Sequence, residues 1–371
     1  MTETTIPLVD LHAQYLSIKS AVDAAIERVI ATSSYIGGPA VREFEEAYSA
    51  DYGVKHCVSV ANGTDALYVT LRMLGIGPGD EVLTSAHSWI STSETISQTG
   101  ARPVFVDVDG YYTIDPDLIE SAITPRTRAI IPVHLYGQPA DMTRIAAIAA
   151  SHNLFLVEDC AQAHYATWLG QRVGTFGAAA TFSFYPGKNL GAYGDAGAIL
   201  TNDTQLAQRL RMYANHGALR KHEHAIEGIN SRLDALQAAI LSAKLPHIHD
   251  WTSARQRVAS WYNEALAGIR GIKLPQVRRD ATHVWHLYVI QVANRDAVAA
   301  RLAQRGIQTA VHYPTPLPLL PAYRYLGAAP EQFPAASANA GRILSLPMYP
   351  ELSRQQVELV AESLSLATGG Q

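Results

Sequence analysis

A lysine framed by apolar and aromatic residues is the first candidate for chemistry in this sequence. Lys188 follows the apolar run 180–184 and the turn 185–187, and Leu190 comes soon after it. A lysine in a turn is usually a solvated surface group, but one removed from water has a lowered pKa and attacks aldehydes. The pattern therefore indicates either a surface lysine or one that binds a carbonyl cofactor. Ser183, just before it, could offer a hydroxyl to a phosphate.

Two acids end a second apolar run, at residues 154–159. Glu158 and Asp159 are its last residues, and Gln162 follows three positions after Asp159. These carboxylates either mark a strand end that reaches water, as charged groups mostly do, or include the partner of a buried cation. A protonated pyridine nitrogen is such a cation, because a buried carboxylate keeps it protonated and lets the ring accept electrons. Gln162 could hydrogen-bond a substituent of that ring.

A glycine-threonine turn is a candidate phosphate site. Gly63 and Thr64 lie where an apolar run turns into a helix-like segment, and the free amides of a helix N-terminus suit a phosphate. An ordinary helix start gives the same pattern. Trp89 could stack on a planar cofactor or be an ordinary core or surface residue. The glycine-rich stretch 75–79 follows a helix pattern and precedes a strand pattern, so it predicts a turn and not a phosphate loop.

Alternating apolar runs and helix-like segments must position these side chains. The alternation from residue 55 to about 185 predicts a parallel sheet with right-handed crossovers. Such sheets bind ligands at the carboxyl ends of their strands, where all three candidates lie. Strands are expected at 56–60, 81–84, 103–106, 129–133, 154–157 and 180–184, and helices at 64–74, 91–99 and 141–151.

The C-terminal part reads as a smaller domain. A long helical pattern starts near Ser231 and continues past Pro246 towards Tyr262. A strand at 286–292, a helix at 297–305 and a proline-rich loop at 314–321 follow. A chain of 371 residues suits two packed domains. We expect a large domain over 1–246 and a small α+β domain over 247–371.

Composition excludes several classes of function. The formal net charge of −4 offers no overall attraction to nucleic acid or to an anionic membrane. The chain has two cysteines, both in apolar stretches, and its start carries no apolar signal segment, so we expect a cytoplasmic protein. No metal is expected, because the histidine pairs at 222–224 and 247–249 lack a third ligand at a recognisable spacing.

The order of these pieces resembles the DegT/DnrJ/EryC1/StrS family of sugar aminotransferases, which are fold-type-I enzymes dependent on pyridoxal 5'-phosphate. The resemblance runs from residues 35–38 to 345–350. Its most specific stretches are 132–139, 158–164 and the segment around Lys188. It implies an α/β fold with a mostly parallel central sheet flanked by helices, and a smaller α+β C-terminal domain.

The same resemblance implies roles for individual residues. Lys188 carries the cofactor covalently and moves the proton as general base and acid, and Asp159 pairs with the pyridine nitrogen. The other implied cofactor contacts are Gln162 at the ring hydroxyl, Trp89 on the ring face, Gly63, Thr64 and Ser183 at the phosphate, and Asn230 at the phosphate of the neighbouring subunit. The implied sugar contacts are Tyr185, His312 and Tyr313.

The implied reaction moves an amino group from L-glutamate to a nucleotide-linked keto sugar in a homodimer with shared active sites. Asn230 and the Gly37-Gly38 loop are the positions that imply the dimer. Relatives that aminate C-4 often carry histidine where this chain has Tyr185, so the expected acceptor is a dTDP-3-keto-6-deoxyhexose. A C-4 keto sugar or an inosose is the alternative. A sugar dehydratase of this fold would have histidine in place of Lys188, and a non-catalytic regulator would need an output domain.

Overall fold

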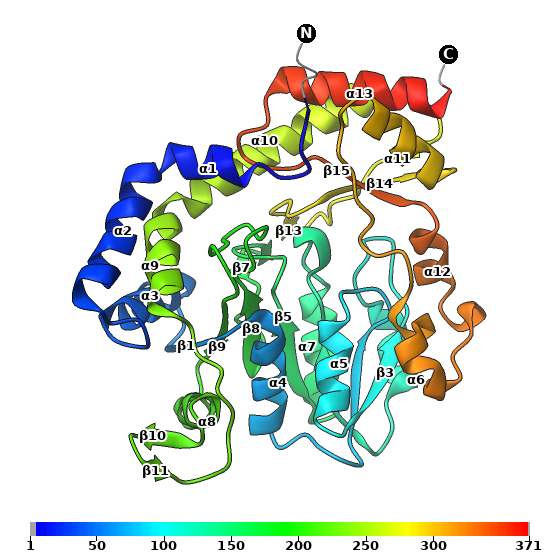
Figure 1. Ribbon diagram of the computed structural model, residues 1–371. Coiled ribbons are helices and arrows are strands. Elements are labelled where there is room, and N and C mark those ends of the chain that lie inside the picture. The colour runs from blue at the N-terminus through cyan, green and yellow to red at the C-terminus, as the bar shows by residue number, and fades with distance from the viewer. Residues whose placement is uncertain (1–4, 370–371) are drawn as a thin grey trace.

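The computed structural model describes residues 5–369, and a seven-stranded sheet forms the centre of the larger lobe (Figure 1). Its strand order is β1-β9-β8-β5-β4-β2-β3. The expectation of a mostly parallel sheet is confirmed, since only β9 runs against its neighbours. The strands are β1 His56–Val60, β2 Glu81–Ser85, β3 Arg102–Val106, β4 Thr127–Ile131, β5 Phe155–Asp159, β8 Ala179–Ser183 and β9 Gly197–Thr201.

The expected pairing of β1 needs a correction. A parallel neighbour was expected for it, but β1 pairs antiparallel with β9, a strand that the alternation of strands and helices did not indicate. β9 follows β8 after the loop that carries Lys188, and no helix separates the two strands. All five residues of β9 are buried, and the strand lies between β1 and β8. An antiparallel neighbour needs no helical crossover, so the loop alone can join β8 to β9.

Two of the helices that follow strands have side-chain N-caps that the hydrogen bonds define clearly. Asn62 accepts a hydrogen bond from Asp65 N at the start of α4, Gly63–Met73. Asp141 does the same with Arg144 N for α7, Met142–Ser151. The stretch 75–79 is the turn between α4 and β2. The remaining helices of this lobe are α5 Ser91–Gln98, α6 Pro116–Ala122 and α8 Thr204–Ala214.

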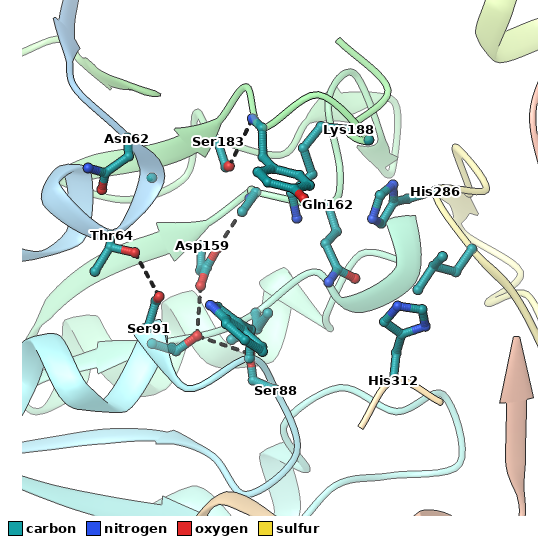
Figure 2. Close-up of a pocket in the computed structure, with 18 of the residues that line it drawn as sticks. Asn62, Thr64, Ser88, Ser91, Asp159, Gln162, Ser183, Lys188, His286 and His312 are labelled. Carbon is teal, nitrogen blue, oxygen red and sulfur yellow. Dashed lines mark hydrogen bonds between the residues drawn. The ribbon is translucent and has the colours of Figure 1, made fainter. Parts of the chain in front are cut away.

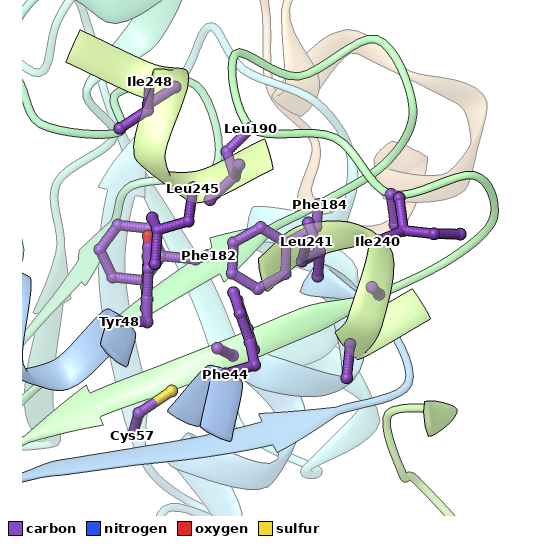
Figure 3. Packing of buried hydrophobic residues seen from close by; sticks show 14 of the residues in the cluster. Phe44, Tyr48, Cys57, Phe182, Phe184, Leu190, Ile240, Leu241, Leu245 and Ile248 are labelled. Atoms are coloured by element: carbon purple, nitrogen blue, oxygen red, sulfur yellow. The ribbon is translucent and has the colours of Figure 1, made fainter. Parts of the chain in front are cut away.

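Three N-terminal helices that the sequence analysis did not predict complete the larger lobe. They are α1 Leu11–Ser17, α2 Lys19–Thr32 and α3 Pro39–Tyr52, and α2 and α3 pack on α9, Ala235–Lys244. Aromatic rings of α3 and β8 form a buried cluster behind the Lys188 loop (Figure 3). Phe44 and Tyr48 each pack edge-on against Phe184, with ring centroids 5.3 and 5.4 Å apart. This cluster fixes the strand that leads into the loop.

The C-terminal part forms a second lobe with its own core. A small sheet of β12 Ile272–Lys273, β14 Tyr288–Val292 and β15 Ile343–Leu346 packs with α10 Ile248–Leu266, α11 Arg295–Gln304 and α13 Arg354–Thr368. The long helical pattern is divided at Pro246, where a 3-10 turn, Leu245–His247, joins α9 to α10. The N-terminal Ile6 also belongs to this core and pairs with Ile307. The N-terminal segment therefore crosses between the lobes.

Between residues 5 and 369, none of the helices has the length and apolar character that crossing a bilayer requires. Short elements complete this part of the chain. The strands are β6 Thr167–Trp168, β7 Gln171–Arg172, β10 Ala218–Arg220, β11 Glu223–His224 and β13 Ala281–Thr282. The helical segments are α12 Pro334–Ala340 and the 3-10 turns Leu135–Gly137, Leu317–Leu319, Pro321–Leu326 and Pro330–Gln332.

Candidate active site

A cavity of about 590 Å³ lies just past the carboxyl ends of the central strands, where its lining also takes residues from the C-terminal lobe (Figure 2). The expected location of the chemistry at these strand ends agrees with its position. The cavity brings together every residue that was predicted to contact the cofactor or the sugar, except Asn230. Its predicted members are Gly63, Thr64, Trp89, Asp159, Gln162, Ser183, Tyr185, Lys188, His312 and Tyr313.

The Lys188 loop is a tight turn that aims the lysine into the cavity. Lys188 N donates to Tyr185 O at 2.8 Å, and Ala192 N closes the loop on Phe184 O at 2.7 Å. A Cβ on Gly191 would lie 2.3 Å from Pro186 O, so only glycine allows this closure. Burial lowers the pKa of Lys188 to about 8, although the charge of Asp159 acts in the opposite direction. The amine is therefore neutral, and nucleophilic, at a much lower pH than a surface lysine.

The two acids at the end of β5 point to opposite sides of the sheet and have different tasks. Asp159 lines the cavity, where its carboxylate accepts hydrogen bonds from Thr92 Oγ1 at 2.9 Å and Ala161 N at 3.2 Å. Burial raises the pKa of Asp159, and these hydrogen bonds and Lys188 counteract the rise. Neither acid is exposed to water. Asp159 is the buried carboxylate that could face a pyridine nitrogen.

Glu158 is occupied by the protein itself. Its carboxylate accepts backbone N–H groups from Gly174 at 2.7 Å, Phe176 at 2.7 Å and Gly177 at 3.0 Å. His134 Nε2 lies 3.3 Å away, and with Cys160 these residues form a group of potential metal ligands within 4.8 Å of one another. The other nitrogen of His134 accepts Ala140 N at 3.1 Å. The lone pairs of Glu158 and of His134 Nδ1 already accept hydrogen bonds from the protein, and these bonds stabilise the end of β5.

The start of α4 and the end of β8 form one end of the cavity. A Cβ on Gly63 would lie 2.7 Å from Ser183 Cβ, so glycine is needed for this close approach. Thr64 Oγ1 lies 2.7 Å from Ser91 Oγ. Free amides of a helix N-terminus and the hydroxyls of Thr64 and Ser183 therefore meet in one place, which suits a phosphate.

Gln162 and Trp89 lie further along the cavity. Gln162 Oε1 accepts Tyr136 N at 2.7 Å, and its Nε2 donates to the Tyr313 hydroxyl at 3.1 Å. The second hydrogen on that nitrogen remains for a ligand. The Trp89 ring lies 5.6 Å from the Tyr313 ring and is 56% exposed, so a flat apolar surface borders the site.

Sequence reasoning missed several lining residues. Thr92 holds Asp159, and His286 comes from the C-terminal lobe with its Nδ1 3.3 Å from Asn189 Oδ1. Burial lowers the pKa of His286 well below its usual value, so this imidazole is neutral. Thr92 had one usable signal, its place shortly after β2, whereas nothing near His286 in the sequence links it to Lys188. The other missed members include Leu8, Val9, Ser88, Ser91 and Asp195.

Asn230 lies outside the cavity of its own chain. It is exposed at the base of the β10-β11 hairpin, where it pairs with Asn215. The structure thus places Asn230 apart from the other predicted phosphate contacts. A residue that contacts the phosphate of a neighbouring subunit would also lie apart from the contacts of its own chain. Its role stays a prediction.

Comparison with known proteins identifies the family. The model of the DegT/DnrJ/EryC1/StrS aminotransferase family matches residues 17–365. The chain belongs to this family. It is a pyridoxal-phosphate-dependent aminotransferase. It is 48% identical to the erythromycin biosynthesis sensory transduction protein EryC1 of Saccharopolyspora erythraea, over 97% of this chain and 98% of the relative. It is 46% identical to the dTDP-3-amino-3,4,6-trideoxy-alpha-D-glucose transaminase of Streptomyces venezuelae, over 97% and 95%.

Solved structures agree with the assignment of the chain to this family. DesV of S. venezuelae in complex with a ketimine intermediate is 45% identical, with a TM-score of 0.95 and coverage of 98% of both chains. The structure of ntda from Bacillus subtilis, which holds the cofactor PMP, is 32% identical, with a TM-score of 0.87 over 95% of this chain and 82% of that one.

The cavity of the aminotransferase fits such a cofactor. It offers a desolvated lysine at one side, a buried carboxylate for the ring nitrogen, and a helix N-terminus beside Ser183, where the close approach requires glycine at position 63.

Proposed function

We propose that the aminotransferase moves an amino group from L-glutamate to C-3 of a dTDP-3-keto-6-deoxyhexose. The observation that carries the aminotransferase chemistry is Lys188, with its lowered pKa, beside the buried carboxylate of Asp159 in one cavity. The name of the S. venezuelae relative supports a dTDP-linked sugar with nitrogen at C-3. Tyr185, which is 59% exposed and lines the cavity, supports the same choice because relatives that aminate C-4 often carry histidine there.

Each lining residue has a proposed task around pyridoxal 5'-phosphate, which when bound supplies an electron sink for a carbanion. Lys188 holds the cofactor covalently and moves the proton between donor carbon and cofactor. Asp159 keeps the ring nitrogen protonated. The remaining proposed contacts are Gln162 at the ring hydroxyl, Trp89 on the ring face, Gly63, Thr64 and Ser183 at the phosphate, and Tyr185, His312 and Tyr313 at the sugar.

We also propose that the active unit is a homodimer. Among the described residues that line the cavity, Lys188 is the one lysine or arginine, while Asp159 and Asp195 are acidic. The cofactor phosphate, the carboxylates of glutamate and a nucleotide diphosphate are all anions, so one chain leaves them short of partners. Tyr35 and Ile36, beside the Gly37-Gly38 loop, are 44% and 55% exposed, and a second copy would cover them.

Mixing two variants tests the shared site. Asn230→Ala is expected to weaken cofactor retention, and Lys188→Ala to remove activity. A mixed dimer would contain one intact site, made by Lys188 of one chain and Asn230 of the other. Activity of an equal mixture should therefore exceed the sum of the two variants measured separately. Differently tagged chains should be used to prove subunit exchange. Proven exchange without recovery would show that each site is built from one chain.

The acceptor carbon is tested by supplying 3-keto and 4-keto nucleotide sugars separately with glutamate and the wild-type enzyme. We expect amination at C-3, because the side chains around the lysine and not the cofactor set the pose of the sugar ring. NMR of the product locates the new nitrogen. Amination at C-4 alone would contradict the regiochemistry and leave the aminotransferase assignment intact. An inosose should be supplied as a third compound. Conversion of the inosose and of neither nucleotide sugar would favour the cyclitol alternative.

Two other functions, a sugar dehydratase and a non-catalytic regulator, are less well supported. A dehydratase of this fold would have histidine in place of Lys188. A regulatory role is favoured by the name of the EryC1 relative, a sensory transduction protein. A regulator has no need, however, of a lysine with a lowered pKa that faces a buried carboxylate.

We propose the division into domains over 1–246 and 247–371, with one amendment. The segment that contains Ile6 packs in the C-terminal core, so it belongs there structurally. Residues 1–4 and 370–371 lie outside the described residues. A cytoplasmic location is also proposed, and the two buried free thiols, Cys57 and Cys160, agree with a reducing compartment.

A further inference from the structure

The segment 132–139 is among the most distinctive stretches of the sequence, and it follows β4 at the edge of the sheet where the cavity lies. It contains Tyr136, in the 3-10 turn Leu135–Gly137 that follows β4. Tyr136 is buried and has a φ of 61°, a conformation that bulky residues rarely adopt. A backbone in this region persists only where its surroundings hold it. The contacts of Tyr136 therefore show which segments hold it in this conformation.

The backbone of Tyr136 lies between a proposed cofactor contact and the C-terminal lobe. Its N–H donates to Gln162 Oε1 at 2.7 Å, and its carbonyl accepts Leu287 N at 3.2 Å. A Cβ on the next residue, Gly137, would lie 3.0 Å from His286 N, so the two segments touch closely. The turn thus orients the Gln162 amide and receives the segment that carries His286.

The side chain of Tyr136 contacts the segment that carries His312 and Tyr313. Its hydroxyl donates to the backbone carbonyl of His312 and lies 3.0 Å from His87 Nε2. Burial raises the pKa of Tyr136 well above its usual value, so the hydroxyl stays protonated and able to donate. Burial also lowers the pKa of His87 to about 4, so that ring is neutral.

These contacts close into a circuit. Gln162 Nε2 donates to the Tyr313 hydroxyl at 3.1 Å, and Tyr313 is bonded to His312, whose carbonyl Tyr136 holds. Tyr136 is thus the member that touches both the proposed partner of the cofactor ring and the backbone of the proposed sugar contacts. Tyr136 itself does not line the cavity.

We propose that Tyr136 is a positioning residue that fixes the His312-Tyr313 segment relative to Gln162, and so sets how the sugar ring is presented to Lys188. The inference rests on the proposed function. Small displacements of a reacting carbon cost large factors in rate, so a fixed distance between the two sets of contacts matters more for the sugar than for glutamate.

The test is Tyr136→Phe, which keeps the ring and the backbone contacts and removes the hydroxyl. The His312 carbonyl loses its donor, and we expect kcat/KM for the 3-keto nucleotide sugar to fall about tenfold, in line with a lost buried hydrogen bond. The rate of the glutamate half-reaction, followed by the visible absorbance of the cofactor in single turnovers, should stay within about twofold of wild type.

Tyr112→Phe is the matched control. Tyr112 packs against Tyr136 with ring centroids 5.3 Å apart, but its hydroxyl accepts from Gln291 Nε2 at 3.0 Å and does not touch the circuit. Its sugar kinetics should match wild type. Sugar kinetics of Tyr136→Phe within twofold of wild type, or an equal loss in both half-reactions, would overturn the inference. Failure of the wild type to aminate any keto sugar would instead refute the proposed function, and this inference with it.

Discussion

Replacement of Lys188 by alanine is expected to abolish turnover and leave the fold intact. Lys188 has two proposed tasks, the covalent attachment of the cofactor and the transfer of the proton. Proton transfer by a positioned group alone contributes about 10²- to 10⁴-fold, so we expect a loss of more than about 10³-fold. The side chain points into a cavity, and its removal breaks no hydrogen bond between the described elements of the fold.

The measurement combines kinetics with chemical mapping. The purified wild type should show the visible absorbance of a pyridoxal group bound to lysine, and borohydride should fix the cofactor on Lys188. Lys244 is an internal control, because burial lowers its pKa to about 8 as well, yet its Nζ donates to Gly191 O at 2.6 Å. Fixation on any lysine other than Lys188 would refute the assignment, and fixation on Lys244 would show in addition that position in the cavity does not select the residue.

The strand ends were the part of the site that could be predicted from sequence. Asp159, Ser183 and Gly63 all follow or end short apolar runs, and alternation of strands with helices places such positions at one edge of a sheet. The Lys188 loop could be predicted for a related reason, since apolar residues on both sides of a lysine are unusual on a surface. Local patterns were sufficient here because the relevant contacts involve neighbours of a strand end.

Contacts between distant segments could not be predicted. Thr92 binds Asp159 from 67 residues away, and the Tyr136 hydroxyl meets His312 from 176 residues away, with no periodicity that links either pair. The choice between Glu158 and Asp159 depended on the three amides of the 174–177 loop. The antiparallel β9 was missed because the chain returns to the sheet through the Lys188 loop and not through a helix.

Asp159→Asn is expected to give the second-largest loss of activity. The amide is the same size as the carboxylate and can still accept from Thr92 Oγ1, but it carries no charge to keep a pyridine nitrogen protonated. Removing one preorganised electrostatic contact typically costs about 10²- to 10³-fold in kcat, and we expect a loss of that size. Cofactor content, measured after denaturation, should stay near wild type because the proposed phosphate contacts are unchanged.

Glu158→Gln provides the comparison that separates charge from stability. Glu158 is the adjacent buried carboxylate, but its oxygens accept three backbone N–H groups and do not face the cavity. Its loss should lower the unfolding temperature, at a cost of about 1–3 kcal/mol for unsatisfied buried donors, and leave the kcat of the folded enzyme within a few-fold. Asp159→Asn should show the reverse, a large loss of kcat with a smaller fall of the unfolding temperature, because it loses one of two accepted hydrogen bonds, the longer of which comes from Ala161 N at 3.2 Å. Equal losses of kcat in both variants would mean that the end of β5 acts through its shape, and that the charge of Asp159 has no special part in catalysis.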